Sequence, residues 1–196
     1  MRHRSWFTWI LLVVAVPQLG GCFLAAVGAV AVGASAAHDR RGVGTYVDDK
    51  RIYLGAYDSL NKDKELALKS NVKIVVYNGV LLLVGEVRTA ELKARAEQRV
   101  SGFEGTRRIV NELEIGTPQG FWSRRGDNAI TARVKTALLD LTSLPGFDPT
   151  RVNVTTANRM VYLMGKVSHA EDDAVVGIAR NVDGVERVVK VFDYTD

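Results

Sequence analysis

The chain has 196 residues with 26 Lys and Arg, 22 Asp and Glu, and a formal net charge of +4. Loss of residues 1–21, which include Arg2 and Arg4, would lower this charge to about +2, too little to indicate a nucleic-acid partner. The single cysteine excludes an internal disulfide, and with only His38 and His169 outside that segment a Cys/His zinc site is excluded.

The N-terminal segment has the order of a bacterial lipoprotein signal. Arg2 and Arg4 form a positive n-region, and residues 6–16 form an apolar h-region. The residues Leu19-Gly20-Gly21-Cys22 resemble the lipobox, in which the cysteine is acylated and becomes the first residue of the mature chain. We therefore expect cleavage after residue 21 and a lipid anchor on Cys22.

An uncleaved membrane helix is the alternative for this segment. Residues 5–37 contain no Asp, Glu, Lys or Arg, which is more than long enough to cross a bilayer. Pro17 and the pair Gly20-Gly21 interrupt the run just before Cys22, where a signal peptidase needs extended chain, and this favours the lipoprotein. Phe23 after the cysteine, in place of the Asp of inner-membrane lipoproteins, points to the outer membrane.

The remainder of the chain contains a duplication. Residues 78–87 match residues 158–167 at a shift of 80, and after one gap residues 105–110 match residues 184–189. A unit of about 70 residues in two copies is too long and too few for a solenoid. The predicted boundaries are a signal peptide 1–21, an apolar Ala/Gly-rich tether with the lipidated cysteine 22–43, a first domain 44–116, a linker 117–123 and a second domain 124–196.

Each copy is predicted to fold in the order αββαβ. In the first copy Ile52, Ala56 and Leu60 recur at helical spacing, residues 72–76 alternate as a strand, and Asn78-Gly79 is a strong hairpin signal. A second helix at about 90–100 and a last strand at 109–115 complete it. Equivalent elements are expected at about 128–141, 152–154, 158–167, 170–181 and 185–192. The fold class is α+β, with helices on one face of a small mixed sheet.

Gly85 and Gly165 interrupt the second strand of each copy at equivalent positions. A glycine inside a strand weakens it, so it usually marks a bulge or a close backbone approach. We expect a bulge, or a helix backbone pressed against the sheet.

The duplicated pattern resembles the BON domain. It reads Leu81-x-Leu83-x-Gly85-x-Val87 in the first copy and Val161-x-Leu163-x-Gly165-x-Val167 in the second. Two such units behind a lipobox resemble the dual BON-domain outer-membrane lipoproteins of proteobacteria. The resemblance implies a protein facing the periplasm that binds anionic phospholipid of the phosphatidylglycerol type, supports envelope integrity and gathers at division sites. In that family the first helix of the second BON domain contacts the lipid.

On that helix, Ile130, Val134 and Leu138 mark the inward face. The outward face is small and apolar with cations at its flanks, which suits insertion among anionic headgroups. The lipid-binding residues predicted there are Ala129, Ala132, Arg133, Lys135, Thr136 and Leu139. Plain helix propensity is the alternative reason for the alanines. The equivalent helix of the first copy carries a solvated face with Arg51 and Asp58.

Ala129 departs from the family, whose members carry a bulky aromatic residue at that position. Phe121 and Trp122, beside Arg124 and Arg125, are predicted to supply the aromatic anchor from just upstream. The competing interpretation is that this cluster is an interdomain linker packed between the two domains.

No catalytic constellation is present in the sequence, so no enzyme, cofactor or metal site is predicted. Glu86, Glu91, Asp172 and Asp173 are expected at exposed positions, and His169 is expected to cap the helix that follows it. Two other functions stay open. The chain is alternatively a scaffold for outer-membrane assembly machinery, or a periplasmic chaperone.

Overall fold

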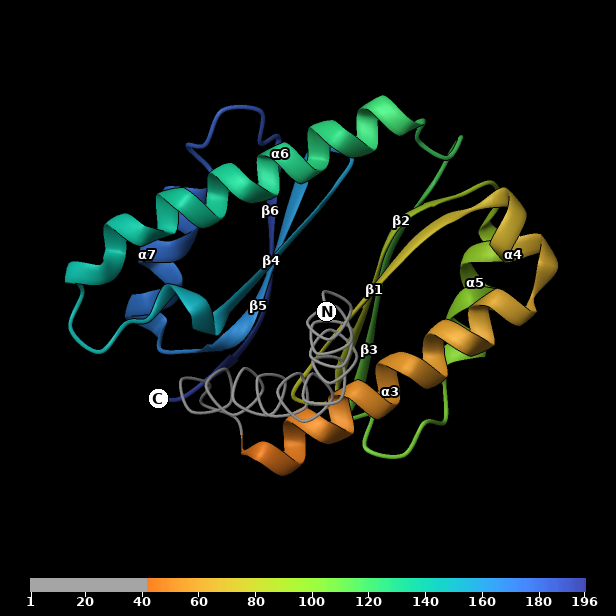
Figure 1. Ribbon diagram of the computed structural model, residues 1–196, viewed down its shortest axis with the longest axis horizontal. Coiled ribbons are helices and arrows are strands. Elements are labelled where there is room, and N and C mark those ends of the chain that lie inside the picture. The colour runs from red at the N-terminus through yellow and green to blue at the C-terminus, as the bar shows by residue number, and fades with distance from the viewer. Residues whose placement is uncertain (1–41) are drawn as a thin grey trace, which may run out of the picture. The chain divides into compact units, whose positions relative to one another are not determined.

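The computed structural model describes residues 42–196 and is shown in Figure 1. Both copies of the duplication belong to one compact unit, Asp39–Asp196. The predicted signal peptide 1–21, the acylation site Cys22 and nearly all of the tether 22–43 lie outside the described residues.

Each copy folds in the predicted order αββαβ, with short helical turns added. The elements of the first copy are α3 Val43–Lys62, α4 Lys64–Lys69, β1 Asn71–Tyr77, β2 Val80–Val87, α5 Ala90–Val100 and β3 Arg108–Ile115. Those of the second are α6 Phe121–Ala137, the 3-10 turns η2 Leu138–Ser143 and η3 Pro149–Arg151, β4 Val152–Ala157, β5 Met160–Val167, α7 His169–Ala179 and β6 Arg187–Tyr194.

Both sheets have three strands with the same topology. β2 lies between β1, with which it is antiparallel, and β3, with which it is parallel. β5 lies in the same way between β4 and β6. The mixed sheet and the α+β class are therefore confirmed.

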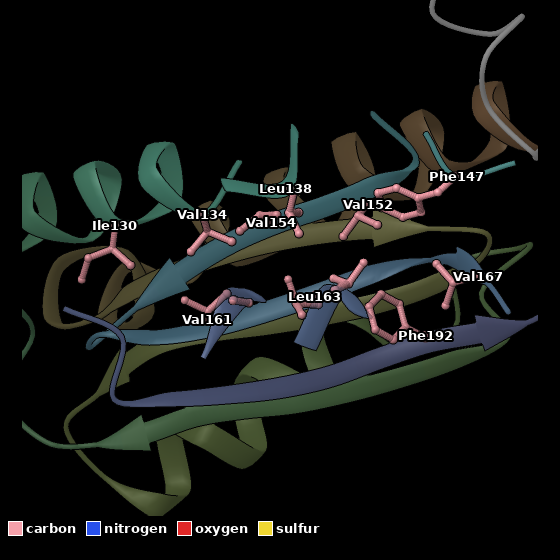
Figure 2. Close-up of a cluster of buried hydrophobic side chains, with 12 residues drawn as sticks. Ile130, Val134, Leu138, Phe147, Val152, Val154, Val161, Leu163, Val167 and Phe192 are labelled. Carbon is pink, nitrogen blue, oxygen red and sulfur yellow. The ribbon is translucent and has the colours of Figure 1, made fainter. Parts of the chain in front are cut away.

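Helices cover one face of each sheet and enclose a separate apolar core. In the second copy Ile130, Val134 and Leu138 point from α6 and η2 onto the sheet, where they meet Val161 and Leu163 (Figure 2). The first copy has an equivalent core of Ile52, Ala56 and Leu60 from α3 against Leu81 and Leu83. The helical periodicity of the sequence therefore identifies the buried stripe correctly in both copies.

A third apolar cluster joins the opposite faces of the two sheets. It explains why every residue of β2 is buried although strands of an antiparallel pair usually alternate. The cluster contains Tyr77, Val80, Leu82, Val84, Ala157, Met160, Tyr162, Met164 and Val191. A domain of this size has a thin core on its own, so burial of the second sheet face adds apolar area that neither copy could bury alone.

Polar contacts at the rim of this interface repeat with the duplication. The side-chain amide of Asn78 donates to the carboxylate of Asp193 at 2.7 Å, and Arg107 pairs with the same carboxylate. Asn158, which is equivalent to Asn78, donates to Glu114, which is equivalent to Asp193. Each hairpin turn is thus bound to the last strand of the other copy.

Gly85 and Gly165 mark a close backbone approach, but the backbone that approaches them belongs to the neighbouring antiparallel strand and its start, and not to a helix. A Cβ added to Gly85 would lie 1.9 Å from the carbonyl oxygen of Asn71, and one added to Gly165 would lie 2.7 Å from that of Arg151. Gly85 also has a φ of +115°, which other residues rarely adopt. Because the glycines have no side chain, the backbone at the start of the antiparallel partner strand can pack directly on them.

A buried aspartate on the first helix of each copy holds the hairpin turn. The carboxylate of Asp49 accepts the backbone N–H groups of Asn78 and Gly79, each at 2.7 Å. Asp127 is 1% exposed and accepts those of Asn158 and Arg159 at 3.1 and 2.9 Å. All four turn residues have positive φ, so each aspartate satisfies donors of a turn with both central residues left-handed.

Two carboxylates expected at the surface are buried. Glu86 is 2% exposed and accepts hydrogen bonds from the side chain of Asn71 and the backbone of Gln119, at 2.8 and 3.1 Å. Asp172 is 3% exposed and accepts hydrogen bonds from the Lys190 ammonium and the Tyr194 hydroxyl. Each of these hydrogen bonds raises the pKa of its donor, Lys190 or Tyr194. These partners lie 15 or more positions away in sequence, so local pattern did not reveal them.

Glu91 and Asp173 are exposed as expected, but the cap of α7 is Ser168. Its hydroxyl accepts from the backbone of Glu171, whose side chain accepts from the Ser168 backbone in return. His169 is the first helical residue, and its ring stacks on Tyr194. The prediction of His169 as the cap was therefore wrong.

We expect Asp127→Asn to destabilise the second copy. An amide offers one acceptor oxygen where the carboxylate offers two, so one buried turn N–H loses its partner, at about 1–3 kcal/mol. The free energy of unfolding in urea measures this loss. Asp183→Asn is the matched control, because Asp183 is 97% exposed and its removal should change stability by less than about 0.5 kcal/mol. Equal effects of the two variants would contradict this role.

The glycine positions predict a graded series. Gly85→Ala meets both a backbone clash and an unfavourable φ, so we expect a loss of about 3 kcal/mol or more. Gly165→Ala meets only the clash and should cost less. Gly177→Ala, inside α7 with open space around it, should be neutral or stabilise by up to about 1 kcal/mol. Urea unfolding of the three variants checks the order, and a reversal of the first two would refute the explanation.

Candidate functional site

The candidate site is the outward face of α6, and the helix is longer than predicted. It begins at Phe121, inside the range 117–123 expected as a linker, and the regular helix ends at Ala137, before the 3-10 turn η2. Sequence reasoning missed the first helical turns because Gly120 and Gly126 resemble loop punctuation. The buried position of Asp127, three residues before Ile130, is the signal that extends the helical stripe upstream.

The extra turns bring the aromatic cluster onto the same face as the alanines. Trp122, Arg125, Ala129, Ala132 and Thr136 are spaced by three or four residues, so they form one stripe along the helix. All of them are exposed, and the stripe lies opposite the residues that pack on the sheet. We call this stripe, together with Phe121 and the flanking cations, the α6 outer face.

The aromatic pair at the start of α6 points into solvent. Phe121 is 55% exposed and Trp122 is 78% exposed, and their rings meet edge to face at 5.4 Å. The Arg125 guanidinium lies over both rings, 4.7 Å from the centre of Phe121 and 5.9 Å from that of Trp122. The interpretation of this cluster as a linker packed between the domains is therefore wrong.

The charge of the α6 outer face is positive. Asp127 is the only acidic residue of α6, and it is buried against the hairpin turn. Within the described part of the chain, Arg124, Arg125 and Lys135 form no ion pair. Arg133 lies 3.7 Å from the exposed carboxylate of Asp183, a distance at which a surface pair contributes little.

At the C-terminal end of the face stands Leu139, which is 55% exposed in the turn η2. Ala129 and Ala132 lie between it and the aromatic pair, and their small side chains leave the middle of the helix low. The apolar groups are thus concentrated at the two ends of α6, with Trp122 and Leu139 as the large ones. The sequence predicts these residues as lipid-binding candidates, and the structure brings them onto one surface.

Helix α3 occupies the equivalent place in the first copy and has a different surface. Its exposed charges pair along the helix, Arg51 with Asp48 at 3.1 Å and Lys62 with Asp58 at 2.6 Å. It also exposes Leu54. Because opposite charges alternate there, α3 presents no cationic surface comparable with that of α6.

None of the described helices is long and apolar enough to cross a membrane. Among residues 42–196 there is also no group of three or more His, Cys, Asp or Glu side chains placed to hold a metal ion.

Comparison with known proteins gives one family over nearly the whole described chain. The model of the BON domain matches twice, at residues 48–117 and 126–196. Among curated proteins, the outer membrane lipoprotein DolP of Haemophilus influenzae is 33% identical over 178 residues, 91% of each chain. The 21 kDa hemolysin of Actinobacillus pleuropneumoniae is 36% identical over 156 residues, 80% of this chain and 79% of that protein.

A more distant relative is the osmotically-inducible protein Y of Escherichia coli, 30% identical over 74% of this chain and 72% of its own. A solved structure of CdsD, a structural protein of the type III secretion system of Chlamydia trachomatis, matches with a TM-score of 0.28 and 12% identity over 74% of this chain and 92% of that chain. A likeness of that level carries no argument about function. The two matches of the BON model together cover more than half of the chain, and by them this chain belongs to the BON domain family, with two BON domains in tandem.

Proposed function

We propose that the protein is an outer-membrane lipoprotein facing the periplasm that binds anionic phospholipid through the α6 outer face. The observation that carries the proposal is the coincidence on one exposed stripe of an aromatic pair, an exposed leucine and cations without carboxylate partners. Similarity to an outer membrane lipoprotein over 91% of both chains supports the location. Acyl chains on Cys22 would provide the permanent anchor.

The chemistry of the face fits the interface of an anionic membrane. Tryptophan prefers the headgroup region, since its ring is apolar and its N–H is polar, and Trp122 stands 78% exposed at the start of the helix. Each basic residue close to an anionic surface adds about 1 kcal/mol. Arg125, stacked on the aromatic pair, combines both contributions, because it would bring its charge to the depth at which the rings insert.

Anchoring and docking would have separate roles. Two or more acyl chains hold a protein stably on a membrane, whereas an interfacial helix binds reversibly and depends on lipid composition. Binding through α6 would therefore decide where on the membrane the protein gathers and how its second domain is oriented. In the cell this would serve envelope integrity and accumulation at division sites.

The main test is flotation of a fragment comprising residues 39–196, the compact unit, with lipid vesicles. We expect it to bind vesicles containing phosphatidylglycerol, to ignore vesicles of phosphatidylcholine, and to dissociate as salt rises. No binding to the anionic vesicles would refute the mechanism. Stoichiometric crosslinking to one assembly factor in cells, without lipid binding, would instead favour the scaffold.

Removal of charge from α6 should weaken this binding strongly. The triple variant Arg124→Gln, Arg125→Gln, Lys135→Gln loses three cations and should bind roughly two orders of magnitude less tightly at low salt. The matched control removes Lys50, Arg51 and Lys62 from α3, with the same change in net charge, and should bind within about threefold of the wild type. Equal losses would mean that net charge alone governs binding.

Trp122 gives a direct optical readout, because it is the only tryptophan of residues 39–196. We expect its fluorescence to shift to shorter wavelength with anionic vesicles, as the exposed ring leaves water. Trp122→Ala should lower affinity by about tenfold or more, through loss of its buried apolar area. Tyr57→Ala, which removes an exposed aromatic ring from α3, is the control and should leave binding unchanged. An unshifted spectrum with bound vesicles would place the contact elsewhere.

A further inference from the structure

A cavity of about 280 Å³ lies between helix α3, the edge strand β1 and the edge strand β4 of the second domain. Tyr46, Asp49 and Tyr53 line it from α3, and Val76 and Asn153 line it from the strands. It does not include any residue of the α6 outer face.

The duplication supplies an equivalent place in the second domain. A shift of 78 carries Asp49 to Asp127, and the hairpin contacts of these two aspartates confirm the correspondence. A shift of 80 carries Lys73 to Asn153, and the sheet registers confirm it, since Lys73 pairs with Val84 and Asn153 with Met164. Lys73 on β1 and Asn153 on β4 therefore occupy equivalent positions, and each lies near the first helix of the other domain.

In the second domain that place is filled by the side chain of Lys73. Its ammonium donates to the carbonyl oxygen of Thr156 at 2.6 Å. Burial lowers the pKa of Lys73, the carboxylates of Asp127 and Glu86 oppose that shift, and Arg124 adds to it. Asp127 and Arg124 are the counterparts of Asp49 and Tyr46, so Lys73 lies among the residues equivalent to those that line the cavity.

The cavity is open because the side chain of Asn153 is shorter than that of Lys73. It does not fill the space beside α3 in the way that Lys73 fills the equivalent space beside α6. Asn153 is exposed. The carbonyl group of Val76 is the counterpart of the Thr156 carbonyl, which accepts the hydrogen bond from the Lys73 ammonium. Two further differences favour a cation there. Tyr46 replaces Arg124 and removes a positive charge, and Tyr53 replaces Thr131, so two aromatic side chains line this cavity.

We propose that this cavity binds a primary alkylammonium group with the reach of a lysine side chain. The ammonium donates to the carbonyl oxygen of Val76, close to the carboxylate of Asp49, and the alkyl chain packs between Tyr46 and Tyr53. The twin place shows that the fold accepts such a group, since Lys73 already occupies it. The proposal is independent of lipid binding by α6.

Lys50 is a competitor at the same cavity. Its ammonium lies 5.6 Å from the centre of the Tyr46 ring, and its counterpart in the second domain is the neutral Asn128. Because Lys50 is exposed, it can leave the ring for solvent when a ligand enters. Replacement of Lys50 by Asn therefore should tighten ligand binding.

The probe is n-butylammonium, with n-butanol as its neutral analogue, titrated into the full-length chain in a neutral detergent and followed by NMR. A charge-assisted hydrogen bond and the two rings should make the amine bind at least about tenfold more tightly than the alcohol, with shifts at Tyr46, Tyr53 and Asn153. Equal affinities, or shifts elsewhere, would overturn the proposal. Equal binding of Nα-acetyllysine amide would identify a protein lysine as the source, and its failure to bind would identify a free amine.

Variants that exchange equivalent residues between the two domains test the assignment of the cavity. Asn153→Lys should fill the cavity and abolish n-butylammonium binding, whereas Asn153→Ser should preserve it. Unchanged binding in a folded Asn153→Lys protein would overturn the assignment. Lys50→Asn should bind at least about threefold more tightly, and this measurement stands if Asn153→Lys does not fold. Lys73→Asn opens the twin place, so n-butylammonium should raise its Tm more than that of the wild type.

Discussion

The packing of the two sheets against each other is the constraint on which the rest of this structure depends. Leu82 and Val84 of one sheet meet Tyr162 and Met164 of the other, and all four side chains are fully buried. A three-stranded sheet with helices on one face leaves its other face apolar and wet, which is unfavourable for a domain of this size. Mutual burial solves that problem for both domains together.

Sheet packing also decides which surfaces are left for function. With both faces of each sheet covered, the helices form much of the outside of each domain, and their outward stripes, the loops and the strand edges reach solvent. On α6 that stripe carries Trp122 and Arg125, with Leu139 following in the turn η2, and on α3 it carries paired charges such as Arg51 and Asp48. The same architectural position therefore has two different surfaces, because the outward residues do not affect the core.

The two domains differ less at the buried aspartates of their first helices than at the edges of their sheets. The buried aspartates of the first helices are interchangeable, since Asp49 and Asp127 hold their hairpin turns in the same way. The residues at the strand edges are not, and the exchange of Lys73 for Asn153 leaves one place filled and the other hollow. At this strand edge the two copies have therefore acquired different chemistry.

Local pattern in the sequence determined much of this protein. Helical spacing of Ile130, Val134 and Leu138 located the buried stripe, and the hairpin signal at Asn78 located the strand pair. These signals succeed because they arise from period and turn chemistry within a few residues. The repeated glycine at Gly85 predicted a close backbone approach, and the approaching backbone belongs to the start of strand β1.

Tertiary structure alone decided the features that depend on distant residues. The burial of Glu86 and Asp172, the junction of the two sheets and the cavity beside Asn153 all involve partners far away in sequence. The alignment of Trp122 with the alanines of α6 needed the true start of the helix, which Gly120 and Gly126 concealed. A periodic pattern reports which face of an element is apolar, but which element covers that face is a property of the folded chain.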